Sequence, residues 1–495
     1  MQPYVIGLDI GTGSTKAVAV TTSGAVLAQA QVYYTSLQTA PQFSEQDPYV
    51  IWAAFIKAIK QTVAKLSHPP AGVSLSSCMH SLILVGDDHK PLTPVITWAD
   101  RRSAALAAAL RETALGRQLY ENTGTPLHAM SPLCKLKWFQ QEEPGLFKKV
   151  AKAISIKEFI WARLFGVYEI DASVASATGL YAITENDWFE PSLQYCGIKK
   201  SQLSTPVSTH FTRANLSETT AAEMQLAVDT PFCIGSSDGC LALIGSHALT
   251  AGTAAITIGT SGAIRLASSR PLAVFPEMIF NYRLDDTTFV SGGAINNGGN
   301  LVQWLVRQFL ESSGEPSEQY ESLFALAASA PPGCAGLICL PYLQGERAPL
   351  WDEGACGVFF GIRPHHSKAH FVRAALEGVC YALDGILKKL EIAAGPIDTL
   401  HVSGGLVQAP FWMQLLADVT GKKLKLWHTE DASAVGAALL GYKAFGFTKA
   451  YPDPVAAEKK VLEPGNACRI VYDQNMDFFH NIYTALKPVM HAIQA

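Results

Sequence analysis

Several features that would assign a chain to other protein classes are missing from this sequence of 495 residues. Its ten cysteines form no C-x-x-C pair, so neither a zinc site nor a disulfide framework is indicated, and buried thiols in a reducing cytoplasm are expected. The net charge of -4 gives no reason to expect nucleic-acid or membrane-surface binding. No apolar run approaches the roughly 20 residues of a membrane span, and no signal peptide is recognisable at the N-terminus.

A glycine turn between two apolar strands opens the chain, over residues 5–20. The β-branched runs predict buried strands, and Gly11 and Gly13 permit the tight turn of a hairpin. Such a turn has little side-chain bulk, so its backbone N–H groups and the hydroxyls of Thr12, Ser14 and Thr15 can surround a phosphate. Asp9, at the mouth of the turn, is placed to hold Mg²⁺ through water.

Two other phosphate motifs do not fit this hairpin. The G-x-x-x-x-G-K-[ST] spacing of a Walker loop is absent. Lys16 stands where the third glycine of a dinucleotide fingerprint should be, and strand character continues where a helix should begin. An ordinary glycine hairpin without a ligand remains the alternative for this stretch taken alone.

A second hairpin of the same design lies at residues 255–267, with the turn Gly259-Thr260-Ser261-Gly262. Two such hairpins, one opening each half of the chain, indicate a duplicated fold with a nucleotide between the halves. This plan resembles the superfamily of actin and the sugar kinases. It implies an α/β fold with two actin-like (ribonuclease H-like) domains flanking an ATP/substrate cleft, which we place at residues 1–248 and 249–495.

Charged residues follow two of the predicted strands in the first half. Asp238 comes directly after the strand predicted over residues 231–237 and before a small-residue helix, where a carboxylate can act as a general base or as a helix N-cap. Asp100 and Arg102 end a strand that begins at Pro94, and in an extended segment they share one face. A structural salt bridge and a ligand-binding role are both open for this pair.

Two long motifs resemble the signatures of the FGGY family of carbohydrate kinases, and the likeness covers nearly the whole chain. The first runs from Met130 to Glu142, and the second from Gly357 to Glu377. His365, His366 and His370 lie inside or beside the second motif, which favours a structural role for them over a metal cluster.

The resemblance implies an ATP-dependent kinase that uses Mg²⁺, with ATP mainly on the second domain and the sugar mainly on the first. Asp238 matches the catalytic base of the family. Glycerol kinases carry an adenine-contacting Asn where this chain has Ala409. The nucleotide-binding positions of the family, together with the turn glycines, are Gly11, Thr12, Gly13, Ser14, Thr15, Lys16, Gly259, Thr260, Gly299, Gln303, Gly404 and Gly405.

The substrate loops argue against glycerol, because Met79-His80 replaces the Arg-Glu pair of glycerol kinases and Met130 replaces an aromatic residue. These loops resemble gluconate kinases most, which predicts phosphorylation of D-gluconate on its 6-hydroxyl. The carboxylate of gluconate needs a cationic partner, for which the candidates are Arg101, Arg102, His80 and Lys157. The substrate contacts expected are Met79, His80, Trp98, Asp100, Arg102 and Asp238.

Two alternatives remain: a xylulokinase-like pentulose or polyol kinase, and a non-catalytic actin-like ATP-binding module. The expected partner is a small-molecule sugar acid or polyol, with no nucleic acid and no membrane. A homodimer is left open, and the expected location is cytoplasmic.

Overall fold

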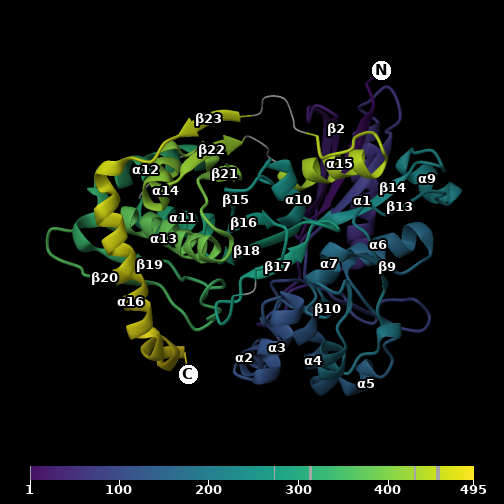
Figure 1. Ribbon diagram of the computed structural model, residues 1–495, viewed down its shortest axis with the longest axis horizontal. Helices are drawn as coiled ribbons and strands as arrows, with labels where there is room; N and C mark the ends of the chain where they lie inside the picture. The colour runs from purple at the N-terminus through teal and green to yellow at the C-terminus, as the bar shows by residue number, and fades with distance from the viewer. Residues whose placement is uncertain (1, 273, 311–314, 428–430, 453–457, 495) are drawn as a thin grey trace. The chain divides into compact units, whose positions relative to one another are not determined.

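The structure is a computed structural model that describes residues 2–272, 274–310, 315–427, 431–452 and 458–494. The chain divides into two compact units (Figure 1). Both units are discontinuous, whereas the domains expected from the sequence are continuous, because two segments of the second half pack with the first. Unit 1 comprises Met1–His247, Ala267–Ser291 and Asp431–Val455, and unit 2 comprises Ala248–Leu266, Gly292–Glu430 and Ala456–Ala495.

A six-stranded sheet forms the centre of unit 1, with the order β13-β14-β5-β1-β2-β3. The predicted hairpin is confirmed and extended to a three-stranded meander, since β2 pairs antiparallel with both β1 and β3, and Asp9 lies opposite Lys16. Strands β1, β5 and β14 are parallel to one another. The strands are β1 (Tyr4–Ile10), β2 (Ser14–Thr21), β3 (Val26–Tyr33), β5 (Gly72–Ser77), β13 (Thr212–Arg213) and β14 (Phe232–Ser237).

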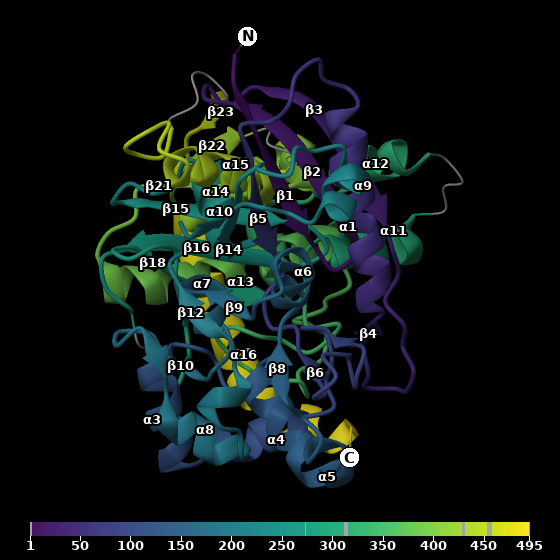
Figure 2. The same ribbon diagram turned by 90° about the vertical axis from the view of Figure 1, so that its right-hand side faces the viewer.

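Helix α1 (Pro48–Val63) runs beside β2 and β3, as Figure 2 shows. It begins as the sequence predicts, with Asp47 as N-cap accepting a hydrogen bond from the Tyr49 amide and with Pro48 at the first helical position. Ile51, Phe55 and Ile59 recur at helical spacing and are buried. The apolar stripe of α1 therefore covers one side of the meander.

Helices α10 (Asp238–Gly245) and α15 (Ala432–Ala444) pack against each other, and α15 also packs against β1. Glycines permit this close approach. A Cβ atom at Gly7 would lie 1.8 Å from the Ala434 carbonyl oxygen, and one at Gly436 would lie 2.0 Å from that of Leu241. A segment from the end of the chain thus completes the core of unit 1.

The rest of unit 1 carries short elements. The strand expected from Pro94 is only β7 (Val95–Ile96), and residues 97–103 form turns, so Asp100 and Arg102 do not lie in extended backbone. The remaining strands are β4 (Glu45–Gln46), β6 (Ile83–Val85), β8 (Lys152–Ile154), β9 (Glu169–Asp171), β10 (Tyr181–Ala182), β11 (Asp187–Trp188), β12 (Thr205–Val207) and β17 (Phe280–Arg283). The helices are α2 (Ala104–Arg111), α3 (Ala114–Thr123), α4 (Pro132–Glu142), α5 (Pro144–Phe147), α6 (Ile156–Phe165), α7 (Ala172–Ser176), α8 (Glu190–Cys196) and α9 (Glu218–Met224), with the 3₁₀ turn η1 (Lys200–Gln202).

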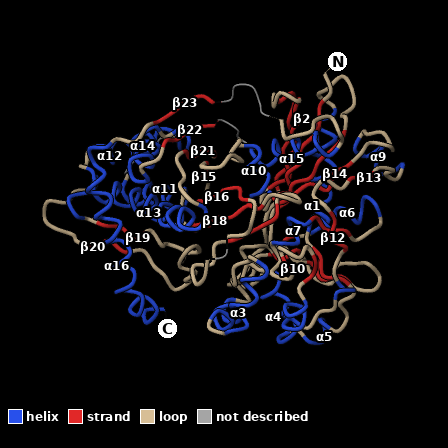
Figure 3. Tube along the Cα trace, viewed as in Figure 1, coloured by secondary structure: helices blue, strands red, loops and turns tan. Residues whose placement is uncertain are grey.

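The strands of unit 2 form a sheet with the order β18-β16-β15-β21-β22-β23. Figure 3 shows its strands in red with the helices α11, α13 and α14 in blue. The second predicted hairpin is confirmed, since β15 pairs antiparallel with β16, and β15, β21 and β22 are parallel. The strands are β15 (Thr253–Ile258), β16 (Gly262–Ser268), β18 (Phe289–Ile295), β21 (Thr399–Ser403), β22 (Lys423–Trp427) and β23 (Glu458–Leu462).

The order β3-β2-β1-β5-β14 in the first sheet matches β18-β16-β15-β21-β22 in the second. The hairpin pair is antiparallel and the next two pairs are parallel in both sheets. The duplicated actin-like α/β fold expected from the two hairpins is therefore confirmed. The other elements of unit 2 are β19 (Ile338–Leu340), β20 (Val358–Phe360), α11 (Gly299–Phe309), α12 (Pro316–Ala328), α13 (Lys368–Ala394), α14 (Pro410–Thr420), α16 (Arg469–Gln494), η2 (Pro332–Gly336), η3 (Gly405–Gln408) and η4 (Asn466–Cys468). Among the helices that the structure describes, none has the length and apolar character needed to cross a bilayer.

Candidate active site

Two acidic residues meet at one edge of the sheet in unit 1. Asp9 lies near the end of β1 beside Ser76 of β5, whose hydroxyl donates a 2.5 Å hydrogen bond to the Asp9 carboxylate. Asp238 comes directly after β14. Because β1, β5 and β14 are parallel, their carboxyl ends lie at the same edge, where open α/β sheets bind ligands.

The electrostatics of this edge reflect the proximity of the carboxylates. Burial raises the pKa of Asp9 to about 7, and the negative charges of Asp238 and Asp431 add to that rise, while Ser76 and Lys16 oppose it. Burial, followed by the charges of Asp238 and Asp9, raises the pKa of the Cys78 thiol to about 12. Cys78 is therefore a neutral thiol beside a concentration of negative charge.

Asp238 is the first residue of α10 rather than its N-cap, which is Ser237. Its carboxylate accepts a 2.6 Å hydrogen bond from the amide of Gly239, and the residue is half-buried. The N-cap alternative from the sequence therefore does not describe this residue. Its role as general base stays a prediction.

The first hairpin turn is held by hydrogen bonds from its surroundings. The Thr12 hydroxyl accepts from Trp98 Nε1 at 2.9 Å, and the Ser14 hydroxyl accepts from Gln31 Nε2 at 2.8 Å. Both hydroxyls keep a proton to donate to a phosphate oxygen. The Thr15 hydroxyl instead lies 3.2 Å from the hydroxyl of Tyr34, and Thr15 is fully buried. Beside Gly13, no atom lies within 4 Å of the position that a Cβ would take.

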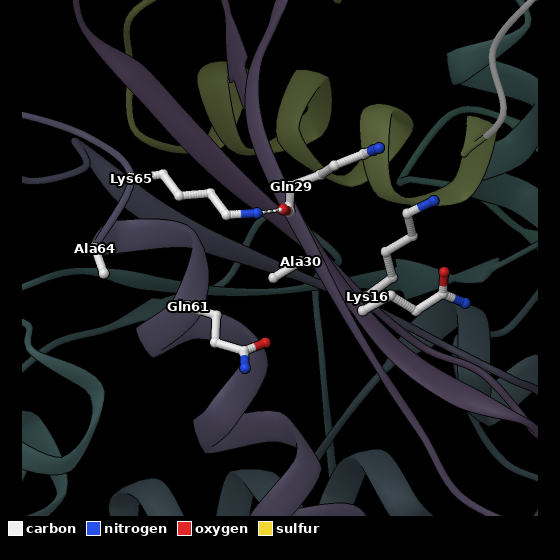
Figure 4. Close-up of a pocket in the computed structure, with 7 residues that line it drawn as sticks. Lys16, Gln29, Ala30, Gln61, Ala64 and Lys65 are labelled. Carbon is white, nitrogen blue, oxygen red and sulfur yellow. Dashed lines mark hydrogen bonds between the residues drawn. The ribbon is translucent and has the colours of Figure 1, made fainter.

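Lys16 forms an ion pair with Asp431, at the start of α15. It also lines a groove of about 700 Å³ along the edge strand β3, shown in Figure 4. There Lys16 extends toward α15, while Lys65 donates a 2.6 Å hydrogen bond to the Gln29 carbonyl. Of the predicted site residues, Lys16 alone lines this groove, so we do not assign it to the nucleotide or the sugar.

His80 is fixed in a left-handed backbone conformation, with φ of 66°. Its Nδ1 lies 2.7 Å from the Ala177 carbonyl oxygen, which can only accept, so Nδ1 carries the proton. Its Nε2 lies 3.3 Å from the Tyr282 hydroxyl. The buried ring therefore forms hydrogen bonds at both nitrogen atoms, and the neighbouring Met79 is half-buried.

Arg102 is held by two carboxylates. Its Nε donates to Asp100 Oδ1 at 2.8 Å, and its Nη2 donates to Glu45 Oε1 at 2.5 Å. The guanidinium also lies 3.9 Å from the ring centroid of Phe43. The salt-bridge alternative for Asp100 and Arg102 is therefore present in the structure, and a direct substrate contact by either residue stays a prediction.

The remaining candidates for a carboxylate partner differ in exposure. Lys157 is buried, and its Nζ donates to Asp171 Oδ2 at 2.7 Å and to the Ser236 carbonyl at 2.9 Å. Arg101 is exposed on the same turn as Trp98, and its backbone amide donates to the Gln42 carbonyl at 2.8 Å.

The predicted nucleotide residues of unit 2 gather at the carboxyl ends of β15 and β21. The Gly259 carbonyl accepts from the Gly299 amide at 2.7 Å, so the start of α11 holds the hairpin turn. Gly404 has φ of 107°, and a Cβ there would lie 2.4 Å from the Ile258 carbonyl oxygen. The backbone at Gly404 therefore packs closely against the backbone of β15.

Two glycines near Gly404 border open space. No atom lies within 4 Å of the place that a Cβ would take at Gly259 or Gly405. Thr260 and Gln303 are exposed. This end of the sheet therefore has room for a ligand next to backbone groups, as a nucleotide site requires. Ala409, by contrast, is buried at the N-cap of α14.

Glu346, for which no role was predicted, is buried beside the start of α11. Its Oε1 accepts from the amides of Asn296 and Arg347 at 2.6 and 2.8 Å, and burial raises its pKa to about 7. The Glu346 Oε2 and Asn297 Oδ1 atoms are buried without a hydrogen-bond partner. Asp431 and Glu45 were also missed, because nothing local in the sequence links them to Lys16 and Arg102.

No group of three or more His, Cys, Asp or Glu side chains in the described ranges is placed to hold a metal ion. Mg²⁺ in phosphoryl-transfer enzymes is usually held by one or two carboxylates, water and phosphate oxygens, and Asp9 with Asp238 is a donor set of that kind. His366 and His370 accept hydrogen bonds from the amides of Arg363 and Ser367 at the start of α13, which is a structural role.

Comparison with known proteins gives matches over both units. The N-terminal domain of the FGGY family of carbohydrate kinases matches residues 4–245, and its C-terminal domain matches residues 254–445. A gluconokinase of Bacillus subtilis is 39% identical over 457 residues, which cover 90% of this chain and 88% of that protein.

Solved structures extend the match to three dimensions. A gluconate kinase and a ligand-bound xylulose kinase, both from Lactobacillus acidophilus, each have a TM-score of 0.93 and 30% identity to this chain. Each comparison covers 98% of both chains.

Proposed function

The chain belongs to the FGGY family of carbohydrate kinases, which makes it an ATP-dependent sugar kinase, and from this premise we propose that it phosphorylates D-gluconate on the 6-hydroxyl. The observation that carries the choice of sugar is the 39% identity to a gluconokinase over 90% of this chain. The Met79-His80 and Trp98–Arg102 segments, which resemble gluconate kinases, support the same choice.

Asp238 is the proposed general base. In the reaction the 6-hydroxyl oxygen attacks the γ-phosphorus, the bond to the departing ADP oxygen breaks, and the hydroxyl proton passes to the Asp238 carboxylate. The amides of Thr12 and Gly13 in the hairpin turn stabilise charge on the phosphoryl oxygens. Asp9 is the proposed ligand of Mg²⁺, which neutralises phosphate charge when bound. Gly259, Thr260, Gly299, Gln303, Gly404 and Gly405 are the proposed nucleotide contacts in unit 2.

Arg101 is the proposed partner of the gluconate carboxylate. Arg102, Asp100 and Glu45 together carry a net charge of about -1 when all three are ionised, so that cluster does not attract an anion. Lys157 is neutralised by Asp171, and His80 holds its proton toward Ala177. Arg101 is exposed on the turn that carries Trp98, and a guanidinium matches a carboxylate well.

A panel of sugars tests the proposal. Purified protein with Mg²⁺ and ATP is offered gluconate, xylulose, ribulose, glycerol and gluconate's neutral analogue sorbitol, with ADP release as the readout. We expect gluconate to give the highest kcat/KM and a product that 6-phosphogluconate dehydrogenase oxidises. A higher kcat/KM for xylulose would replace this proposal with the second candidate, which the equal similarity to the xylulose kinase structure supports.

The same panel addresses the alternative of a non-catalytic ATP-binding module. A kinase releases ADP quickly only when its sugar is present, whereas a module that closes around ATP gives no sugar-dependent ADP release. The cytoplasmic location remains part of this proposal, since ATP and sugar acids are metabolites of that compartment.

A further inference from the structure

Lys135, on helix α4, is fully buried, and its ammonium group lies against backbone oxygen atoms. Its Nζ donates to the carbonyl of His80 at 2.6 Å and to that of Thr97 at 2.7 Å, with the carbonyl of Ile96 at 3.5 Å. These acceptors belong to two separate loops, one after β5 and one after β7. A single side chain on a third element therefore connects both loops.

Burying an ammonium group is costly, so packing alone does not account for this lysine. A leucine or methionine would fill the volume without loss of hydration. Burial lowers the pKa of Lys135 to about 7, although the charge of Asp100 favours the protonated form. A residue that is unfavourable for stability and yet bonds two candidate substrate loops is expected to act on those loops.

We propose that Lys135 is a positioning residue that holds the His80 loop and the Thr97–Trp98 turn in a fixed arrangement, so that they form one sugar-binding surface. The proposal rests on the assignment of these loops to the sugar site, and it does not depend on gluconate being the sugar. Lys135 itself reaches only backbone atoms of the loops, so it acts through His80 and Trp98.

Both loops depend on outside support. His80 has a left-handed backbone, which a non-glycine residue adopts only when its surroundings hold it there. Thr97 donates its hydroxyl to Ser44 at 2.7 Å, and the next residue, Trp98, donates to Thr12 in the hairpin turn. Lys135 therefore also ties the sugar loops to the turn proposed to hold phosphate.

The protonation state of Lys135 sets the number of these hydrogen bonds. An ammonium has three donors, one for each carbonyl, whereas a neutral amine has two and turns a lone pair toward the third. We therefore expect the hydrogen bonds from Lys135 to the two loops to weaken as pH rises through about 7. The titratable and charged groups that face Lys135 are Asp100, Arg102, Cys134 and Cys78.

The test compares Lys135→Met, which keeps the length and loses the donors, with Lys135→Arg, which keeps donors that do not titrate near neutral pH. Lys137→Met is the matched control, because Lys137 lies on the same helix and bonds Gln140 instead of the loops. KM for sugar and for ATP is measured with whichever sugar of the panel the parent phosphorylates best. A negative result for gluconate thus leaves this test intact.

We expect Lys135→Met to raise the KM for sugar about tenfold or more, with the KM for ATP within about twofold of the parent and with parental values in Lys137→Met. In the parent, the KM for sugar should rise between pH 6 and 8 (roughly one unit either side of the Lys135 pKa of about 7), and Lys135→Arg should flatten that rise. A folded Lys135→Met with a parental sugar KM overturns the proposal, and so does an equal loss for ATP and sugar. If Lys135→Met does not fold, the pH comparison decides, and the same rise in parent and Lys135→Arg overturns it.

Discussion

Six ionisable side chains of unit 1 near the candidate site fall into two groups. Arg102 with Asp100, and Lys157 with Asp171, neutralise each other inside the protein. Asp9 and Lys135 have pKa values moved to about 7, in opposite directions, because burial outweighs their partners. Strongly perturbed groups of this second kind concentrate at functional sites. The structure places both beside the loops to which we assign phosphate and sugar.

Replacing Asp238 with Asn removes the proposed base and keeps the size of the side chain. We expect kcat to fall by about 10² or more, because general-base catalysis contributes 10²–10⁴-fold, while ATP affinity stays near the parental value. Steady-state kinetics and calorimetry with ATP measure the two quantities. Near-parental turnover in Asp238→Asn would remove this residue from the mechanism.

Replacing Arg101 with Ala removes the proposed partner of the gluconate carboxylate. A charge-assisted hydrogen bond contributes about 1.5–3 kcal/mol, so the KM for gluconate should rise about ten- to a hundredfold. The KM for a neutral substrate of the panel should change little, and Arg101→Lys should recover part of the loss. An equal effect on gluconate and on the neutral substrate contradicts the assignment.

Replacing Arg102 with Ala tests a structural role instead. The variant leaves Asp100 and Glu45 without their cation at a site where the Arg102 side chain is 4% exposed. Breaking a buried pair in this way costs about 3–5 kcal/mol. Urea unfolding should show a loss on that scale, with a weaker KM for every sugar tested. Parental stability, with a KM change confined to gluconate, would support direct contact with the substrate.

At the scale of elements, the sequence predicts what is local. Both hairpins and the α1 cap are predicted because glycine, β-branched and capping residues act within a few positions. The sequence does not predict strands β17, β22 and β23 or the pairing of α15 with α10, because the partners of these elements lie far away in the chain. Residues 97–103 fold as turns because contacts from Ser44 and Lys135 decide their conformation.

The candidate site divides in the same way. Asp9 and Asp238 could be singled out because one lies near the end of a predicted strand and the other directly follows one, and parallel strands bring such positions together. Asp431 and Glu45 carried no signal, since an ion pair between distant segments leaves no local pattern. The identities of most nucleotide positions came from the family resemblance, and their roles stay predictions.

Replacing Gly259 with Val tests the second hairpin as a nucleotide-binding element. The fold has room for the new side chain, since no atom lies within 4 Å of its Cβ position, so stability should stay near the parental value. ATP affinity should fall at least tenfold, because the side chain fills space proposed for phosphate, while sugar affinity is kept. Calorimetry measures both, with Gly145→Val as a control at a similarly open glycine. Unchanged ATP affinity would contradict the proposed contact.

At the scale of the whole molecule, the raised pKa of Asp9 links folding to pH and to Mg²⁺. The folded-state pKa of about 7 exceeds the ordinary value of 3.8, so the native state binds more protons between these values. The contribution of Asp9 to stability is therefore largest at low pH and is lost as pH rises from about 4 to 7. A bound Mg²⁺ would compensate the ionised carboxylate.

We expect Asp9→Asn to be more stable than the parent at pH 8 without ligands and to differ less at pH 5. MgATP should raise the melting temperature of the parent more at pH 8 than at pH 6, and this difference should vanish in Asp9→Asn. Asp229→Asn, at an exposed position, is the control. A parent whose MgATP stabilisation is independent of pH would contradict the assignment of Asp9 to Mg²⁺.

Unit 1 is assembled from three separate stretches of the chain, and its helix α15 begins only at Ala432. During synthesis on the ribosome, strands β1, β2 and β5 emerge early, but the helix that packs on β1 follows more than 350 residues later. At about 5–20 residues per second, that face of the nascent sheet stays uncovered for roughly 20–70 seconds. Unit 1 therefore cannot finish folding as an N-terminal domain ahead of the rest, because one of its core helices is translated only after nearly all of the chain.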